Sequence, residues 1–385
     1  MSGAKKQKIL ALSPSASSKI PDASSAVDHW PRLSDEIVLI ILRLLPEKDL
    51  VKSSLINKRF RDLSRDKTLW TELTLDYVNF KQNAESCRKL VERCEKLSSL
   101  KISNKTCQWD KLNIMMTVVT RAKESLRCLE INNALKEWSP AAMAKLGSLQ
   151  NLRSLTFSFS SVIALAVNSY KGAKVLEELA NLDQLEVLKL RITRYLWSNH
   201  SNSNSLPVLK SVFQQLKKLK EVDIYTTDYD DSLVVALAEN NTSLKMLRLR
   251  NYPYLSDETV DVLANSCPAL EELAISFSRG DDAIDKLSSS FPRIKSLIIG
   301  GSTVPIDTTD QKLTKYVEAF RSLESLDLVG YTYHHYHVTD SGIERMVSSA
   351  DNLKHLTIRG APRVTEDLVE RLRKEYPSLD LRIYH

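Results

Sequence analysis

The chain has 385 residues, of which 43% are hydrophobic and 26% charged, and a formal net charge of +6 at pH 7. That length exceeds the size at which one compact core keeps growing, so we expect several domains or an elongated repeat. No apolar run approaches the roughly 20 residues that span a membrane, and charges of both signs are too mixed along the chain to favour nucleic-acid binding.

The N-terminal residues 1–28 are rich in Ser, Ala and Lys and show no apolar period, which predicts a disordered tail. Lys5, Lys6 and Lys8 are not followed by the long apolar core of a secretory signal. The five cysteines form no Cys-x-x-Cys pair and no zinc-like spacing. Reduced thiols, and a location in the cytoplasm or the nucleus or both, are therefore expected.

The next segment contains a helix that is apolar nearly all round. Residues 37–45 include eight apolar side chains in nine, whereas an amphipathic helix needs one stripe about 100° wide. We expect Ser34 to cap this helix and Pro46 to end it, with a second helix starting at Asp49 and a third around Phe60. About forty surrounding residues are too few to bury such a helix, so a partner should cover it.

This segment resembles an F-box, whose pattern runs Leu-Pro-x-Glu-Ile, Ile-Leu, Leu-Pro, Asp-Leu, Val-Cys-Lys-x-Trp and Leu-Trp. The matching residues are, in order, Leu33, Ser34, Glu36 and Ile37, Ile41 and Leu42, Leu45 and Pro46, Asp49 and Leu50, Ile56 to Phe60, and Leu69 and Trp70. Ser34, Asn57 and Phe60 replace the family's proline, cysteine and tryptophan, which preserves helix initiation and aromatic packing. The resemblance implies a small all-α three-helix F-box over residues 29–75 that docks on a Skp-family adaptor. The expected adaptor-binding residues are Leu33, Ser34, Ile37, Ile41, Leu45, Leu50, Ile56, Phe60, Leu69 and Trp70.

A repeated pattern follows, with apolar residues at its first, fourth and sixth positions. Its ten clear copies start at Leu97, Leu126, Leu152, Leu185, Leu219, Leu244, Leu270, Ile294, Leu323 and Leu353. The spacing of neighbouring starts varies, and it is shortest from Leu270 to Ile294 and longest from Leu185 to Leu219. Trp70 starts a further copy in the same frame, and Leu379 starts a degenerate copy of the kind expected of a terminal cap.

Helix-start signals such as Ser256 and Thr339 lie between the copies, so each repeat is predicted to be one short parallel strand and one helix. Strands stack about 4.8 Å apart and packed helices about 8–10 Å apart, so the stack should curve with its strands on the inner side. The pattern resembles leucine-rich repeats. We therefore predict an α/β leucine-rich-repeat solenoid over residues 76–385, a horseshoe of about eleven repeats with parallel strands on the concave face. Cys94 and Cys267, each three residues before a copy, should face inward near the end of a helix.

Alternate strand positions of the repeats are predicted to line the concave face. Basic residues dominate these positions, with acidic breaks at Glu221, Asp223 and Asp327. Such a mixed surface suits a protein partner better than a duplex, and the alternative is a solvated face without a ligand. The candidate substrate-binding residues are Lys189, Arg191, Tyr225, Arg248, Arg250, His355 and Arg359.

Motifs for catalysis and phosphate binding are absent from the sequence. It contains no Gly-x-Gly-x-x-Gly, no Walker loop, no Gly-x-Ser-x-Gly and no His-Glu-x-x-His. His334 and His337 could join in a metal site, but no carboxylate or cysteine completes the set, and an aromatic recognition loop over residues 331–337 is the competing interpretation. We expect no enzymatic activity, no cofactor and no metal.

The two resemblances together imply an F-box protein with leucine-rich repeats. Such a protein is the non-catalytic substrate receptor of a Skp–cullin–F-box ubiquitin ligase: the adaptor joins it to the cullin–RING ligase, and the repeats hold a protein substrate. Two alternatives stay open. One is a scaffold or regulator that does not promote ubiquitination, and the other is a receptor for a polyanionic small ligand on the basic concave face.

Overall fold

The protein is described from a computed structural model that divides into two compact units, residues 1–64 and 65–385. The described residues are 30–76, 92–103, 118–134, 140–159, 176–192, 205–225, 230–250, 255–275, 282–300, 309–329 and 337–384. Among them, no helix combines the length and the apolarity needed to cross a membrane. The predicted tail at 1–28 lies outside the described residues.

The first unit contains three short α-helices, α1 (Asp35–Leu42), α2 (Glu47–Ser53) and α3 (Lys58–Leu63), after a single 3-10 turn, η1 (Trp30–Arg32). Three helices were predicted, and Ser34 does hold the N-cap position of α1, although its side chain makes no capping hydrogen bond. The predicted start of the second helix at Asp49 is wrong. Helix α2 begins two residues earlier, after Pro46, because the fixed φ of proline suits the position before a first helical turn.

The second unit is a solenoid built on one parallel sheet. Within the described residues, twelve strands pair in strict sequence order, each with the next. They are β1 (Glu72–Asp76), β2 (Ser99–Ser103), β3 (Cys128–Ala134), β4 (Ser154–Phe159), β5 (Val187–Ile192), β6 (Glu221–Tyr225), β7 (Met246–Arg250), β8 (Glu272–Ile275), β9 (Ser296–Gly300), β10 (Ser325–Val329), β11 (His355–Arg359) and β12 (Asp380–Tyr384). Every predicted copy of the repeat, including those starting at Trp70 and Leu379, contains one of these strands.

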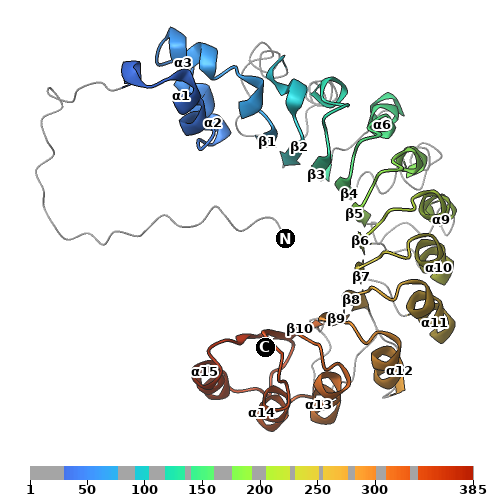
Figure 1. The fold of residues 1–385 in the computed structure, drawn as a ribbon. Helices are drawn as coiled ribbons and strands as arrows, with labels where there is room; N and C mark the ends of the chain where they lie inside the picture. Colours follow the sequence, from blue (N-terminus) through green and yellow to red (C-terminus); the bar gives the residue numbers. More distant parts are fainter. Residues whose placement is uncertain are drawn as a thin grey trace, which may run out of the picture. The chain divides into compact units, whose positions relative to one another are not determined.

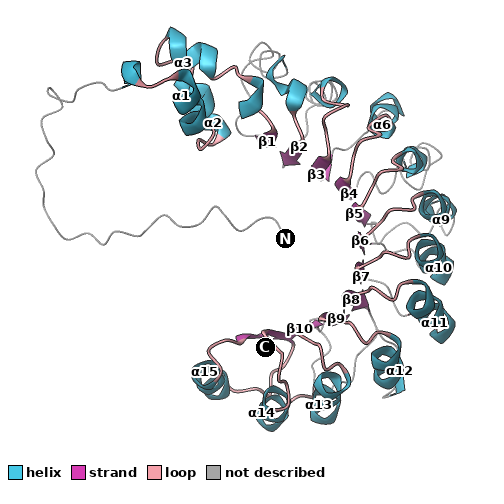
Figure 2. Cartoon of the chain, viewed as in Figure 1, coloured by secondary structure: helices cyan, strands magenta, loops and turns pink. Residues whose placement is uncertain are grey.

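Helices alternate with the strands and lie on the outer side of the curved sheet (Figures 1 and 2). The described α-helices are α6 (Pro140–Gly147), α9 (Ser205–Gln215), α10 (Asp231–Asn240), α11 (Asp257–Ser266), α12 (Asp282–Ser290), α13 (Asp310–Ala319), α14 (Asp340–Ser348) and α15 (Glu366–Glu375). Shorter 3-10 segments are η2 (Lys67–Leu69), η4 (Cys94–Lys96) and η5 (Glu178–Asn181). The strands form the concave side of this unit, as predicted, because they stack more closely than the helices.

The strand register aligns equivalent residues of successive repeats. Leu100 of β2, for example, pairs with Leu73 of β1 on one side and Leu129 of β3 on the other. All three leucines are buried, whereas Lys101, the residue after Leu100, is exposed. Because side chains alternate between the two faces of a strand, one face forms the core and the other forms rows of side chains on the concave surface.

The position three residues before a copy is buried in most of the repeats, for example at Leu149, Leu182 and Leu216. Cys94 and Cys267 both occupy it and are fully buried, which confirms the prediction for them. Burial raises the pKa of each thiol to about 11, so both stay protonated at neutral pH. The Sγ of Cys267 donates a weak hydrogen bond to the carbonyl of Asn241 at 3.5 Å.

Asn241 holds the same position one repeat earlier, where it is polar and buried. Its Oδ1 accepts the backbone N–H of Leu219 at 2.8 Å, and its Nδ2 donates to the carbonyl of Leu237 at 3.0 Å. Asn241 thus joins its own helix to the backbone of the preceding repeat while it is buried. The side-chain amide satisfies a backbone group that would otherwise be buried without a partner.

Replacing Asn241 with alanine is expected to lower the free energy of unfolding by about 1–3 kcal/mol, because the buried N–H of Leu219 loses its acceptor. Urea denaturation followed by circular dichroism measures the change. The matched control is Asn240→Ala, which removes a side-chain bond to the carbonyl of Ala236 at a half-buried site. Equal losses for the two variants would contradict a special role for Asn241.

Successive helices are also joined by carboxylates at their first residues. Asp310 accepts hydrogen bonds from the backbone N–H of Thr339 at 2.8 Å and from its hydroxyl at 2.6 Å. Asp340 makes the same two bonds to Thr365, at the same two lengths. A Cβ on Gly342 would lie 2.1 Å from Oδ1 of Asp310, so glycine leaves the room this carboxylate needs. These contacts hold neighbouring repeats in one register at the helical side of the solenoid.

Candidate functional site

Large apolar side chains are exposed in the first unit to an unusual extent. Nine large hydrophobic residues of the described chain are exposed, and all except Tyr384 lie in the first unit. The eight are Trp30, Ile37, Ile40, Leu44, Leu45, Val51, Leu55 and Ile56. Single exposed apolar residues are normal, but a concentration of this kind in a unit of three short helices marks an interaction surface.

Helix α1 shows how this surface arises. Val38 and Leu42, four residues apart, are buried against the rest of the unit. Ile37 is 46% exposed and Ile40 is 59% exposed, and Leu44, just beyond the end of the helix, is 80% exposed. Residues three apart lie on one face of a helix, so Ile37 and Ile40 form an apolar stripe on the side away from the core, and Leu44 adds an exposed apolar side chain just beyond the helix. The nearly all-round apolar helix therefore has one side buried and one side open.

The interior of the unit uses other members of the F-box pattern. Leu50 and Phe60 are buried, and the Phe60 ring packs edge-on against Trp30 with their centroids 5.0 Å apart. Arg59 holds the start of the unit in place: its Nη1 donates to the carbonyl of Trp30 at 2.8 Å, its Nε donates to Asp35 at 2.8 Å, and it also donates to the carbonyl of Leu33. Asn57 caps α3 by accepting the backbone N–H of Phe60 at 2.9 Å.

The predicted adaptor residues fall into three groups. Ser34, Ile37, Leu45 and Ile56 are exposed, Leu33, Ile41 and Leu69 are half-buried, and Leu50, Phe60 and Trp70 are buried. Trp70 belongs to the second unit, where the guanidinium of Arg93 lies 5.2 Å from its ring centroid. The three buried residues can support a binding surface from beneath, but they cannot contact a partner themselves. The predicted set did not include five further exposed apolar residues, Trp30, Ile40, Leu44, Val51 and Leu55, although the spacing of Ile40 from Ile37 on one helical face could have identified Ile40.

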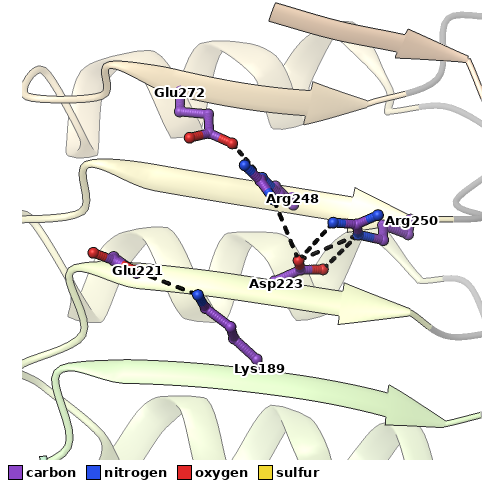
Figure 3. Close-up of polar contacts among 6 residues, drawn as sticks. All are labelled: Lys189, Glu221, Asp223, Arg248, Arg250 and Glu272. Atoms are coloured by element: carbon purple, nitrogen blue, oxygen red, sulfur yellow. Dashed lines mark hydrogen bonds and ion pairs between the residues drawn. The ribbon is translucent and has the colours of Figure 1, made fainter. Parts of the chain in front are cut away.

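The concave face carries a network of ion pairs over strands β5 to β8 (Figure 3). Asp223 accepts from Arg250 through Nε at 2.8 Å and through Nη2 at 2.9 Å, and it lies 3.8 Å from Arg248. Arg248 also pairs with Glu272 on the next strand. Lys189 lies 3.8 Å from Glu221. Figure 3 shows all six side chains on the face of the sheet that points away from the helices.

Similar pairs occur toward both ends of the sheet. Lys101 pairs with Glu130 at 2.8 Å. Burial raises the pKa of Glu130, but hydrogen bonds from Lys101 and Asn132 outweigh that effect, so its pKa lies below the ordinary value. At the other end, the hydrogen bond from Arg382 lowers the pKa of Asp380. His355 lies 3.5 Å from the same carboxylate.

Two predicted arginines on the concave face stack on tyrosines instead. The guanidinium of Arg191 lies 5.2 Å from the ring centroid of Tyr225 on the neighbouring strand, and that of Arg359 lies 4.7 Å from the ring of Tyr384. All seven predicted substrate residues thus line the concave face, but they do not form one basic patch. Most of the positive charge is already paired with carboxylates.

Metal binding finds no support in the described residues, where no group of three or more His, Cys, Asp or Glu side chains is placed to hold an ion. His334 and most of the predicted aromatic loop at 331–337 lie outside the described residues.

Comparison with known proteins agrees with this arrangement. Residues 30–76 match the F-box-like family. The chain carries an F-box-like domain followed by leucine-rich repeats. This domain includes the three helices of the first unit and extends into the second unit through η2 and β1.

Curated relatives share part of the chain. F-box/LRR-repeat protein 21 of Mus musculus is 27% identical over 104 residues, which cover 27% of this chain and 24% of the relative. A putative FBD-associated F-box protein of Arabidopsis thaliana is 37% identical over 92 residues, which cover 24% of this chain and 20% of the relative. The chain therefore matches a quarter or less of the length of these relatives.

Among solved structures, a chain from the crystal structure of the Rad7 and Elc1 complex in yeast superposes with a TM-score of 0.57. The superposition covers 90% of this chain and 93% of that chain, at 18% sequence identity. At that identity the likeness concerns the fold.

Proposed function

We propose that this protein is the substrate-recognition subunit of a Skp–cullin–F-box ubiquitin ligase. The observation that carries the proposal is the concentration of exposed apolar side chains in the F-box-like domain. Such a surface is costly in water and fits a permanent partner of complementary apolar character. On this proposal Ile37, Ile40 and Leu44 contact a Skp-family adaptor, which links the chain to a cullin–RING ligase.

The solenoid then holds a protein substrate close to the ubiquitin-loading enzyme. The chain performs no chemistry: it raises the local concentration of a substrate lysine, which converts an encounter between two molecules into an effectively intramolecular one. The cysteine pattern, without paired motifs, fits a location in the cytoplasm or the nucleus or both. The relatives named F-box/LRR-repeat protein, and a structural neighbour solved as a complex with a second protein, support this reading.

The test is affinity purification of two chains, the full-length protein and a chain lacking residues 30–64, followed by mass spectrometry of the proteins that co-purify. Adaptor and cullin should be lost with the deletion, and substrates should be retained or enriched. A full-length chain that captures no Skp-family adaptor would contradict the proposal. Turnover of a retained partner, compared between the two chains, separates a ubiquitin ligase from a scaffold that only binds the adaptor.

The alternative of a receptor for a polyanionic small ligand is less well supported by the geometry. Arg248 and Arg250, two of the basic residues available to such a ligand, are engaged by Asp223 and Glu272. A polyanion would have to displace these carboxylates or lie against them, which costs electrostatic energy.

A further inference from the structure

Two arginines of the concave face differ from all the other predicted basic residues there. Arg191 and Arg359 are exposed, and among the described residues neither takes part in an ion pair or a hydrogen bond of its side chain. Each guanidinium lies over a tyrosine ring on the next strand, Tyr225 or Tyr384. Both arginines occupy the same row of the sheet: Arg191 pairs in register with Tyr225, and Arg359 pairs in register with Tyr384. The same pairing of an arginine with a tyrosine thus occurs twice on one surface.

The stacking prepares each guanidinium for a ligand. A cation over an aromatic face gains about 0.5–1 kcal/mol at an exposed site, and the contact restricts the long side chain. The N–H groups of each guanidinium donate to no residue of the described chain, so they can donate to a ligand. The edge of a guanidinium is a fork of donors that matches a carboxylate in two parallel hydrogen bonds.

The charges around each Arg–Tyr pair favour a carboxylate over a phosphate as the ligand. Near Arg191, the described cations Arg250 and Lys189 are already paired with Asp223 and Glu221. Arg191 therefore adds one positive charge that no carboxylate of the described chain compensates. A phosphate group carries about −1.5 to −2 charges at pH 7 and would meet repulsion from the nearby carboxylates. Near the pair of Arg359 and Tyr384, Arg382 likewise donates a hydrogen bond to Asp380. One guanidinium balances one carboxylate.

We propose that the pairs Arg191–Tyr225 and Arg359–Tyr384 are two anchors for Asp or Glu side chains of the protein substrate. The assignment rests on the proposed function in that it names the class of substrate: a protein segment or surface with two acidic groups. From β5 and β6 to β11 and β12 there are six strand steps, or about 29 Å along the sheet at about 4.8 Å each. An extended chain needs at least about nine residues to bridge that distance.

The experiment uses the full-length chain and a fluorescein-labelled peptide of four Glu, ten alternating Gly and Ser, and four Glu. Its linker can extend about 33 Å and so can span both anchors. Fluorescence polarisation gives the Kd. Arg191→Gln and Arg359→Gln are each expected to raise the Kd at least fivefold, and the double variant at least 25-fold. The matched control is Arg321→Gln in the turn after α13, an exposed arginine that stacks on no ring of the described chain, which should change the Kd less than twofold.

The role of the tyrosine is tested separately. Tyr225→Phe keeps a ring beneath Arg191 and should bind like the wild type, whereas Tyr225→Ala should raise the Kd about two- to fivefold through the lost contact with the ring. A melt followed by circular dichroism verifies that each variant is folded. Equal binding of the Glu peptide and a Lys peptide of the same design would overturn the proposal, and so would equal effects of Arg191→Gln and Arg321→Gln.

A third peptide, with phosphoserine in place of each Glu, decides the chemistry: tighter binding of this peptide would overturn the assignment to carboxylates. The measurement involves no adaptor. Peptide binding and adaptor capture can therefore succeed or fail independently. Failure of peptide binding contradicts the acidic anchors, and failure of adaptor capture contradicts the proposed ligase function.

Discussion

A chain with Ile37→Asp and Ile40→Asp is expected to lose its Skp-family adaptor, with a binding affinity at least about a hundredfold weaker. Both side chains are about half exposed and lie on the open side of α1. Burying the rest of each isoleucine in an interface contributes on the order of 1 kcal/mol, and an aspartate there adds the cost of a desolvated carboxylate. Together these effects exceed about 2.8 kcal/mol, the free energy that corresponds to a hundredfold change in affinity. Co-expression with the adaptor and calorimetric titration measure the effect.

The fold of the variant should be preserved, because Val38 and Leu42 carry the buried side of the same helix. Lys52→Asp is the control for added negative charge: its side chain is 74% exposed on α2 and pairs with Asp49 at the surface. Loss of that surface pair costs little. If the double variant and the control bound the adaptor equally well, the exposed stripe would not be the docking surface.

Gly300→Ala is expected to lower the free energy of unfolding of the solenoid by about 3 kcal/mol or more, for two reasons of backbone geometry. Gly300 ends strand β9 with φ at +122°. Residues other than glycine adopt this backbone conformation only with a strain of about 1–3 kcal/mol. In addition, a Cβ there would lie 2.1 Å from the carbonyl oxygen of Val329 on the paired strand β10. The clash is with backbone, so no side-chain rotation relieves it. Urea denaturation followed by circular dichroism gives the change.

Ser296→Ala is the comparison for this prediction, since Ser296 is half-buried at the other end of the same strand. It should change the free energy of unfolding by less than about 0.5 kcal/mol. A Gly300→Ala chain as stable as the Ser296→Ala chain would mean that β9 and β10 can shift apart without loss, contrary to a tightly registered sheet.

The concave surface shows where reasoning from sequence reached its limit. Alternation along each strand correctly placed Arg248 and Arg250 on the open face, because the period of a strand is a local property. Their pairing with Asp223 depends on which residue of the neighbouring repeat lies in register, and that residue is distant in the chain. The sequence therefore predicted a mixed surface with acidic breaks, and only the register shows which carboxylate pairs with which arginine.

For this protein, the amino-acid sequence by itself determined the repeat, its strands, the inward direction of its leucines and the burial of Cys94 and Cys267. Those features follow from local periodicity and from the free energy of burying apolar side chains. Only the tertiary structure decided which side of α1 stays open, that Asn241 joins two repeats through a buried backbone N–H, and that Arg191 and Arg359 stack on tyrosines. The reason is physical: exposure and pairing are set by neighbours across helices and strands, and no local pattern contains those distances.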